Sequence, residues 1–288
     1  MARRKKQIIP GVRVVSIGHK GLCIGKTQEG EAVLVKGAVP GDLIDFQMRK
    51  KRNGMKWGAP ISFLEYSSDR VDPVCSHFEH CGGCSWQNLD YATQADQKQA
   101  WVHQTIRRIG HVEEAELLPI LAAERQLDYR NKMVFSFSRR RWMTPEEVRS
   151  GVKIEESGLG FYAGGSFDKV INIHQCHLQD GISNDIRNAT RDWALVEGWT
   201  FYDAKAHKGD LRNLMVRMSR NGEVMVMLVT GNNNQDIIDS FAGMMDQRFP
   251  EVQESLPDGV NLIPYYNQST LVNNAVRTVR DALWQGGI

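Results

Sequence analysis

The first sixty-odd residues alternate short apolar runs with turn-forming residues. Val12, Val14 and Ile17 mark the first run, and further runs cover 22–24, 32–35 and 43–48. The residues that separate them include Gly18, Gly21, Gly25, Gly30, Gly37, Pro40 and Gly41. Closely spaced short strands with glycine turns are typical of a small closed sheet, because closure removes exposed strand edges. We therefore expect a β-barrel at the start of the chain.

Basic residues are concentrated in the same region. Residues 1–60 hold 13 lysines and arginines against 4 acidic residues, whereas the rest holds 23 basic and 30 acidic residues. An N-terminal basic cluster comprises Arg3, Arg4, Lys5 and Lys6, and a hairpin basic cluster comprises Arg49, Lys50, Lys51 and Arg52. The second cluster precedes Asn53-Gly54, a hairpin signal, and lies close to Trp57. A basic loop beside an aromatic residue on a small barrel indicates nucleic-acid binding, and the alternative is a solubilising tail with a solvated loop.

Composition places the chain among folded proteins. Apolar residues make up 41% and charged residues 24%, and 288 residues allow two ordinary domains. The sequence contains no apolar stretch of membrane-helix length, and its first ten residues lack the apolar core of a signal peptide. We expect a cytoplasmic protein with no membrane partner, whose five cysteines serve metal binding or chemistry before disulfides.

The rest of the chain predicts a mixed, mainly β structure. Residues 67–73 resemble a linker, and a helix is expected from about Tyr91 to Ile109 with Ala95 and Val102 on its apolar face. Strands are expected at 132–137, 160–162, 169–173, 214–218 and 223–230, and further helices at 237–247 and 271–284. The fold class is therefore mainly β, with an α+β part after the barrel.

Three cysteines form the most specific local pattern. Cys75, Cys81 and Cys84 stand in the sequence CSHFEHCGGC, whose two glycines allow a turn that brings thiolates together. A closed tetrahedral or cubane site needs a fourth ligand, and Cys176 is the best candidate because it follows a predicted strand. This spacing favours a metal site over unrelated buried thiols.

Zinc and an iron–sulfur cluster both suit these cysteines. His77, His80, His174 and His177 lie close to them in the sequence, and mixed Cys/His sites are common for zinc. Spacing alone leaves the two metals open. Cys23 stands apart in the barrel region and is expected to be a small core residue.

Several motifs then follow one another in an order that identifies a family resemblance. The barrel and CSHFEHCGGC precede YRNKM at 129–133, LGFY at 159–162, the Cys176 segment and LRNLMVR at 211–217. Over residues 8–230 the chain resembles the bacterial RNA (uracil-5-)-methyltransferases that carry a TRAM domain, the type that methylates 23S ribosomal RNA. The resemblance implies an OB-like TRAM barrel at 1–66, a central domain at 67–288, and a helical arm at 91–118 that packs on the catalytic domain.

The resemblance also decides between the two metals. It implies a [4Fe–4S] cluster held by Cys75, Cys81, Cys84 and Cys176. In the family this cluster orders structure and helps to shape the RNA-binding surface, and methyl transfer itself requires no redox step.

The parts that perform methyl transfer in that family are not visible in this sequence. The family ends in a Rossmann-like domain that binds S-adenosylmethionine and carries a nucleophilic cysteine, which is needed because uracil C5 is a poor nucleophile until a thiolate adds at C6. Here Gly158-Leu159-Gly160 lacks the continuation of a G-x-G-x-x-G turn, and no cysteine follows Cys176. We expect a chain without the Rossmann-like domain, inactive alone, either cut from a longer protein or naturally shortened. We assign it no catalytic or S-adenosylmethionine-binding residue.

Basic and aromatic side chains of the central domain complete the predicted RNA-binding surface. Both basic clusters are expected to neutralise phosphates, and Arg130, Lys132 and Arg212 to line the RNA face of the central domain. Phe135 and Phe137 are expected to pack in the core. The run Arg139-Arg140-Arg141-Trp142 is expected to be exposed.

The leading hypothesis is therefore a monomeric RNA-recognition and cluster-bearing part of a 23S rRNA methyltransferase. The alternative is a standalone RNA-binding module with a structural zinc or iron–sulfur site and no catalysis. An iron–sulfur electron carrier is disfavoured, because a carrier needs no basic barrel.

Overall fold

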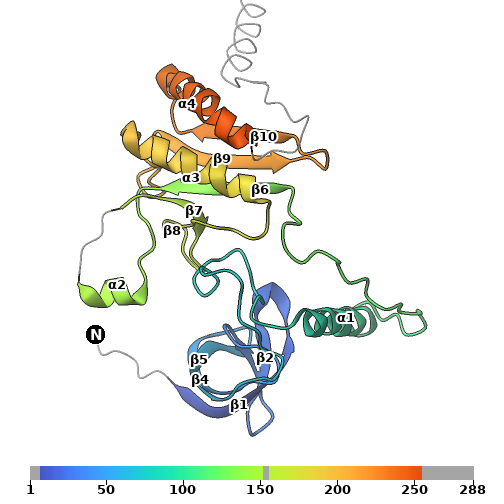
Figure 1. The fold of residues 1–288 in the computed structure, drawn as a ribbon. Coiled ribbons are helices and arrows are strands. Elements are labelled where there is room, and N and C mark those ends of the chain that lie inside the picture. Colours follow the sequence, from blue (N-terminus) through green and yellow to red (C-terminus); the bar gives the residue numbers. More distant parts are fainter. Residues whose placement is uncertain (1–6, 152–155, 255–288) are drawn as a thin grey trace, which may run out of the picture. The chain divides into compact units, whose positions relative to one another are not determined.

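The computed structural model describes residues 7–151 and 156–254, which belong to two compact units, Met1–Gln126 and Leu127–Ile288 (Figure 1). The units divide after Gln126, whereas the sequence predicted a domain boundary after residue 66. The N-terminal basic cluster and the predicted helix at 271–284 lie outside the described residues. Within those residues, no helix is both long and apolar enough to cross a membrane.

Five strands of the first unit close into a barrel, in the order β1-β2-β3-β5-β4. The predicted small barrel is thus confirmed. A short 3-10 turn, η1 (His19–Gly21), connects the first two strands. The strands are β1 (Ile8–Ile17), β2 (Cys23–Lys26), β3 (Ala32–Val35), β4 (Leu43–Arg52) and β5 (Met55–Glu65). The fifth had not been predicted.

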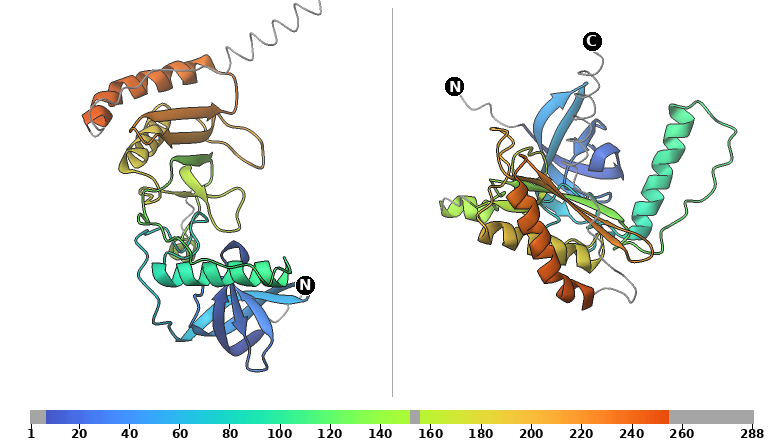
Figure 2. Two further views of the ribbon diagram at one scale, coloured as in Figure 1. Left: turned by 90° about the vertical axis from the view of Figure 1, so that its right-hand side faces the viewer. Right: turned by 90° about the horizontal axis from the view of Figure 1, so that it is seen from above.

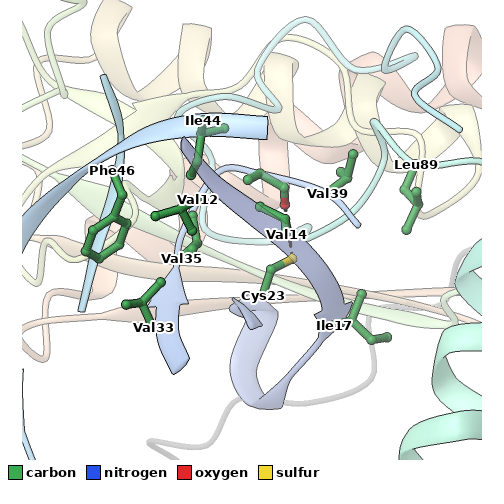
Figure 3. Close-up of a cluster of buried hydrophobic side chains, with 11 residues drawn as sticks. Val12, Val14, Ile17, Cys23, Val33, Val35, Val39, Ile44, Phe46 and Leu89 are labelled. Carbon is green, nitrogen blue, oxygen red and sulfur yellow. Dashed lines mark hydrogen bonds between the residues drawn. The ribbon is translucent and has the colours of Figure 1, made fainter. Parts of the chain in front are cut away.

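Alternating side chains of these strands fill the barrel. Figure 3 shows Val12, Val35, Ile44 and Phe46 gathered in this core, and all four are fully buried. Gly58 of β5 has to be glycine, because a Cβ there would lie 2.0 Å from the carbonyl oxygen of Gln47. The core therefore depends on close backbone approach as well as on apolar packing.

Residues 67–90 are attached to the barrel. Asp42, which is fully buried, accepts two hydrogen bonds from the guanidinium of Arg70, at 2.8 and 2.7 Å, and one from the backbone N–H of Ser67. Leu89 joins the barrel core. The predicted linker at 67–73 is therefore a packed connection, because a buried carboxylate needs these donors.

Helix α1 (Tyr91–Arg108) begins at Asp90, whose side chain caps the first turn. It ends ten residues before the predicted limit of 118, so the prediction of a helix over 91–118 was wrong for its last part. The chain then turns back alongside α1 (Figure 2), where the Gln99 amide bonds the backbone of Leu118 and Ile120. The predicted apolar face is buried only at Ala95, and Val102 stays 46% exposed.

The second unit contains an antiparallel five-stranded sheet in the order β10-β9-β6-β7-β8. All five predicted strands occur in it, with shifted ends. They are β6 (Lys132–Ser138), β7 (Gly158–Tyr162), β8 (Val170–Asn172), β9 (Leu211–Met218) and β10 (Val224–Thr230). The Gly158-Leu159-Gly160 sequence lies in β7, where a Cβ at Gly160 would lie 2.1 Å from the carbonyl oxygen of Ile171. These glycines allow close strand pairing, as expected for a structural role.

Two long helices accompany this sheet, α3 (Gly181–Val196) and α4 (Gln235–Glu254), and a short helix, α2 (Pro145–Ser150), precedes β7. Helices α3 and α4 pack together (Figures 1 and 2). The indole of Trp193 contacts Phe241 and donates a hydrogen bond to the Ser240 hydroxyl at 3.1 Å. Phe135 and Phe137 are buried, which confirms their predicted core role.

Candidate functional site

The hairpin of β4 and β5 presents the hairpin basic cluster to solvent. Arg49, Lys50, Lys51 and Arg52 are all exposed, and Asn53 and Gly54 form the turn with φ of 49° and 77°. Lys50 Nζ lies 4.9 Å from the centre of the Trp57 ring on the neighbouring strand. The cations are therefore held on a paired strand next to an aromatic ring, which is a surface suited to phosphates and bases.

One acidic residue, Glu31, offsets only part of the positive charge of this hairpin. Glu31 pairs with Lys56, whose hydrogen bond lowers the pKa of the Glu31 carboxyl. Glu31 also interacts electrostatically with Lys51 of the hairpin basic cluster, so a single carboxylate faces Lys56 and the four cluster cations, and the hairpin stays positive.

The cysteine motif of the first unit is organised by hydrogen bonds to sulfur. The backbone N–H of Gly83 points at Cys81 Sγ at 3.4 Å, and Gln87 Nε2 points at Cys84 Sγ at 3.2 Å. The carbonyl oxygen of the same Gln87 side chain accepts from the backbone N–H of Cys75 at 3.2 Å. Donors aimed at sulfur stabilise thiolates and tune iron–sulfur clusters.

The Cys176 segment of the second unit is held by α3. The backbone N–H of Cys176 donates to Asn184 Oδ1 at 2.7 Å, and Asn184 Nδ2 donates back to the Cys176 carbonyl at 3.1 Å. Arg187 donates to the carbonyls of Ile173 and His174 at 3.0 and 2.6 Å and to Asn184 Oδ1 at 2.8 Å. The backbone that carries Cys176 is therefore fixed by two side chains of one helix.

Arg187 is a fully buried cation. Burial lowers the pKa of its guanidinium to about 10, and its ring contact is with Phe135, 5.1 Å away. Burial also lowers the pKa of His174 on the same segment. A buried guanidinium whose acceptors are neutral places positive charge close to Cys176, which suits a thiolate at that position.

The four predicted cluster cysteines are divided between the two units. Cys75, Cys81 and Cys84 belong to the first unit and Cys176 to the second, and all four are half-buried. Among residues 7–151 and 156–254, no group of three or more His, Cys, Asp or Glu side chains is close enough together to hold a metal ion. Cys23 is buried in the barrel core, as expected.

The three cations predicted to line the RNA face of the central domain lie at two ends of one strand pair. Lys132 of β6 pairs with Arg217 of β9, whereas Arg212 lies at the other end of the same strand pair, beyond the Ser136–Asn213 pair. Arg130 and Lys132 are exposed, and the guanidinium of Arg212 lies 5.0 Å from the Tyr202 ring. The structure therefore places Arg130 and Lys132 at one end of the β6–β9 ladder and Arg212 at the opposite end.

The predicted exposure of the run 139–142 holds only for Arg139 and Arg140. The Arg141 side chain is 16% exposed and pairs with Glu147 at 2.6 Å and Glu156 at 2.7 Å. Its guanidinium lowers the pKa of Glu147 to about 2. Arg141 is thus a structural residue that ties α2 to the strands, because a half-buried cation needs paired carboxylates.

Sequence reasoning missed the three residues that position the cysteines: Gln87, Asn184 and Arg187. An amide three residues after Cys84 carried no distinguishing pattern. The helix that carries Asn184 and Arg187 did show a recognisable pattern. Asp180 is its N-cap, and Ile182 and Ile186 follow at helical spacing. Recognising that helix would have indicated which side chains face the Cys176 segment.

Known proteins provide an independent comparison. No protein-family model matches the chain. A Bacteroides thetaiotaomicron protein named an uncharacterized RNA methyltransferase is 39% identical over 241 residues, which is 82% of this chain and 53% of that protein. A Chlorobaculum tepidum protein with the same description is 37% identical over 262 residues, 90% of this chain and 54% of that protein.

A solved structure shares the fold. The crystal structure of Pyrococcus abyssi tRNA (uracil-54, C5)-methyltransferase in complex with S-adenosyl-L-homocysteine superposes with a TM-score of 0.53 and 20% identity. The match covers 77% of this chain and 46% of that one. The chain is a homologue of proteins named as RNA methyltransferases and spans about half the length of the curated relatives it matches.

Proposed function

We propose that this chain is the RNA-recognition part of a TRAM-type, iron–sulfur RNA (uracil-5-)-methyltransferase that acts on 23S ribosomal RNA. The observation that carries RNA recognition is the β4–β5 hairpin, with four exposed cations next to Trp57. Relatives named as RNA methyltransferases support RNA as the substrate class. The motif resemblance supports uracil C5 and ribosomal RNA, and a tRNA substrate is the competing outcome.

In this role the chain binds and positions RNA and performs no bond-making step. S-adenosylmethionine, when bound by a complete enzyme of this type, supplies the methyl group. Within residues 7–151 and 156–254, no strand leads into a G-x-G-x-x-G turn. A standalone RNA-binding module is the second candidate, and the exposed hairpin cations suit it equally well.

We propose that Cys75, Cys81, Cys84 and Cys176 hold a [4Fe–4S] cluster in the loaded protein. Binding would require these thiols to gather more closely than in the structure, where no three such side chains of the described residues are grouped for a metal. Four cysteines provide the donor set that such a cluster needs, and hydrogen bonds to the sulfurs of Cys81 and Cys84 support thiolate character. Zinc is the competing metal because four thiolates also suit it. The role proposed for the cluster is structural.

The hairpin is tested by the salt dependence of RNA binding to the full chain. Replacing Lys50 and Lys51 with glutamine should lower the slope of log Kobs against log salt by about 1.4, because each phosphate contact contributes about 0.7 for single strands. The matched control replaces Arg107 and Arg108 with glutamine; both are exposed in the last turn of α1, away from the β4–β5 hairpin, and this variant should leave the slope unchanged. Equal slopes in both variants would move RNA recognition away from the hairpin.

The metal is tested on chain purified without oxygen, by visible absorption and by assays of iron, sulfide and zinc on one sample. Matched iron and sulfide with a broad visible band are expected. Cys81→Ser should reduce both, because loss of a ligand weakens the site. One zinc per chain and no colour would favour the zinc-stabilised RNA-binding module.

A further inference from the structure

The second unit carries a group of exposed cations that neither predicted basic cluster includes. Three segments supply them: the end of β6, the β7–β8 connection, and the turn before β9 together with the first part of that strand. All of them are exposed. We call the group the second-unit basic surface, and its members are Arg139, Arg140, Lys169, Lys205, Lys208 and Arg212.

Backbone contacts bring the three segments together. The backbone N–H of Arg139 donates to the carbonyl of Tyr202 at 3.1 Å, and the N–H of Val170 donates to the carbonyl of Arg140 at 3.3 Å. The hydroxyl of Ser138 donates to the carbonyl of Asp168 at 2.9 Å. Side-chain contacts also cross between the segments: Arg139 pairs with Asp203, Lys205 pairs with Asp168, and Arg212 lies over the Tyr202 ring. The segments that carry the six cations are therefore neighbours in one unit.

The acidic residues of this region are buried under the cations. Lys205 Nζ pairs with Asp168 at 2.6 Å, and Arg139 pairs with Asp203 at 3.8 Å. The carboxylate side chains are only 11% and 14% exposed, whereas their cationic partners are 52% and 69% exposed. Asp203 also accepts from the backbone N–H groups of Lys205 and Ala206, so it shapes the turn that presents the lysines. Asp210, between Lys208 and Arg212, is a third carboxylate of this region and accepts hydrogen bonds from Thr200 and Asn232. Six cations against three carboxylates leave a positive outer layer.

Aromatic rings are interleaved with these cations. Phe167 is 66% exposed, which leaves most of a large apolar ring in water, and Lys205 Nζ lies 5.9 Å from its centre. The Tyr202 ring lies under the guanidinium of Arg212. The exposed ring of Phe167 and the half-buried ring of Tyr202 lie among the cations, which matches the alternation of bases and phosphates along a nucleic-acid strand.

We propose that the second-unit basic surface binds a single-stranded segment of RNA. Lys205, Lys208 and Arg140 contact phosphates, and a base stacks on Phe167. A single strand is favoured over a duplex, because stacking on Phe167 needs a base with a free face. The inference rests on the proposed function for the nature of its ligand, and adds a second contact region to the hairpin.

The first test compares two double variants of the full chain in binding to a single-stranded oligoribonucleotide. Lys205→Ala with Lys208→Ala should lower the salt slope by about 1.4, since two phosphate contacts are lost. The control is Arg220→Ala with Arg248→Ala, which removes the same charge from exposed positions. Arg220 follows Met218, the last residue of β9, and Arg212 lies roughly 20 Å away near the first residue of that strand. Arg248 lies on α4, which supplies none of the six cations.

The second test separates stacking from charge. Phe167→Ala should weaken single-strand binding about tenfold, the effect of losing one base stack, and Phe167→Trp should retain it. Binding of duplex RNA should respond to neither change. Photocrosslinking with 4-thiouridine-containing RNA should map a crosslinked peptide at Phe167.

The outcomes distinguish this inference from the proposed function. If the unaltered chain binds no RNA, the proposed function fails. If it binds RNA and the Lys205/Lys208 variant keeps the slope of the Arg220/Arg248 control, this inference alone is overturned. The same holds if Phe167→Ala weakens duplex and single-strand binding equally, since that result removes the role of stacking.

Discussion

At the scale of single residues, Cys23 differs from the other four cysteines in its burial and its pKa. Cys23 lies in the barrel core, where its thiol donates to the carbonyl of Ala38 at 3.1 Å. Burial raises the pKa of this thiol from 9.0 to about 12. A neutral buried thiol is inert, whereas the four motif cysteines are only half-buried and can be reached by reagents in solution.

Iodoacetamide should therefore label the cysteines in two classes after reduction and metal removal. The four motif cysteines should react first at pH 8, and Cys23 should react only on unfolding, as read by peptide mass spectrometry. The folded state keeps the Cys23 proton when the unfolded state has lost it, so this thiol's contribution to stability is intact below pH 9 and is lost as pH rises towards 12. Rapid native labelling of Cys23 at pH 8 would contradict its place in the core.

At the scale of elements, the hairpin turn shows how local backbone geometry serves binding. Gly54 has φ of +77°, and a Cβ there would meet nothing within 4 Å. Gly30, between β2 and β3, has φ of +82° and the same open surroundings. The two glycines are thus matched in conformation, and only Gly54 adjoins the hairpin basic cluster.

Gly54→Ala should lower the free energy of unfolding by roughly 1–2 kcal/mol, because an L side chain is strained in the left-handed region. Gly30→Ala should cost a similar amount in urea denaturation. RNA affinity should fall only for Gly54→Ala, since that turn sets the register of the cationic strand. Equal RNA affinities of the two variants would indicate that the hairpin tip takes no part in binding.

Helices show where element prediction failed. The apolar spacing of α1 predicted one buried face, and the structure buries it only at Ala95, with Val102 and Ile109 left exposed. Periodicity reports which residues share a face and not whether anything covers that face. Helix α3 was missed although it has a cap and apolar spacing, and it carries the buried Arg187.

At the scale of the whole molecule, the chain divides at an exposed segment. Residues 110–126 have no helix or strand and are almost all exposed, and Arg125 lies one residue before the end of the first unit. Exposed backbone without secondary structure is where proteases cut folded proteins.

Limited trypsin digestion should therefore cut after Arg125 early and leave two resistant fragments, one on each side. Mass spectrometry of a time course measures this. First cuts within β4 or β9 would show that the two units are not the cooperative parts of the molecule.

The sequence by itself determined the barrel, the strands of the second sheet and the exposed hairpin. It also grouped Cys75, Cys81 and Cys84 and set Cys23 apart from them. Glycine turns, alternation and motif spacing carry this information because they are local properties. Tertiary structure decided what each side chain does. It made Arg141 structural through Glu147 and Glu156 and fixed the Cys176 segment from α3 through Arg187. It also gathered the second-unit basic surface from three segments separated in the chain. Burial and long-range hydrogen bonding depend on which strands pair, and pairing is a property of the whole fold.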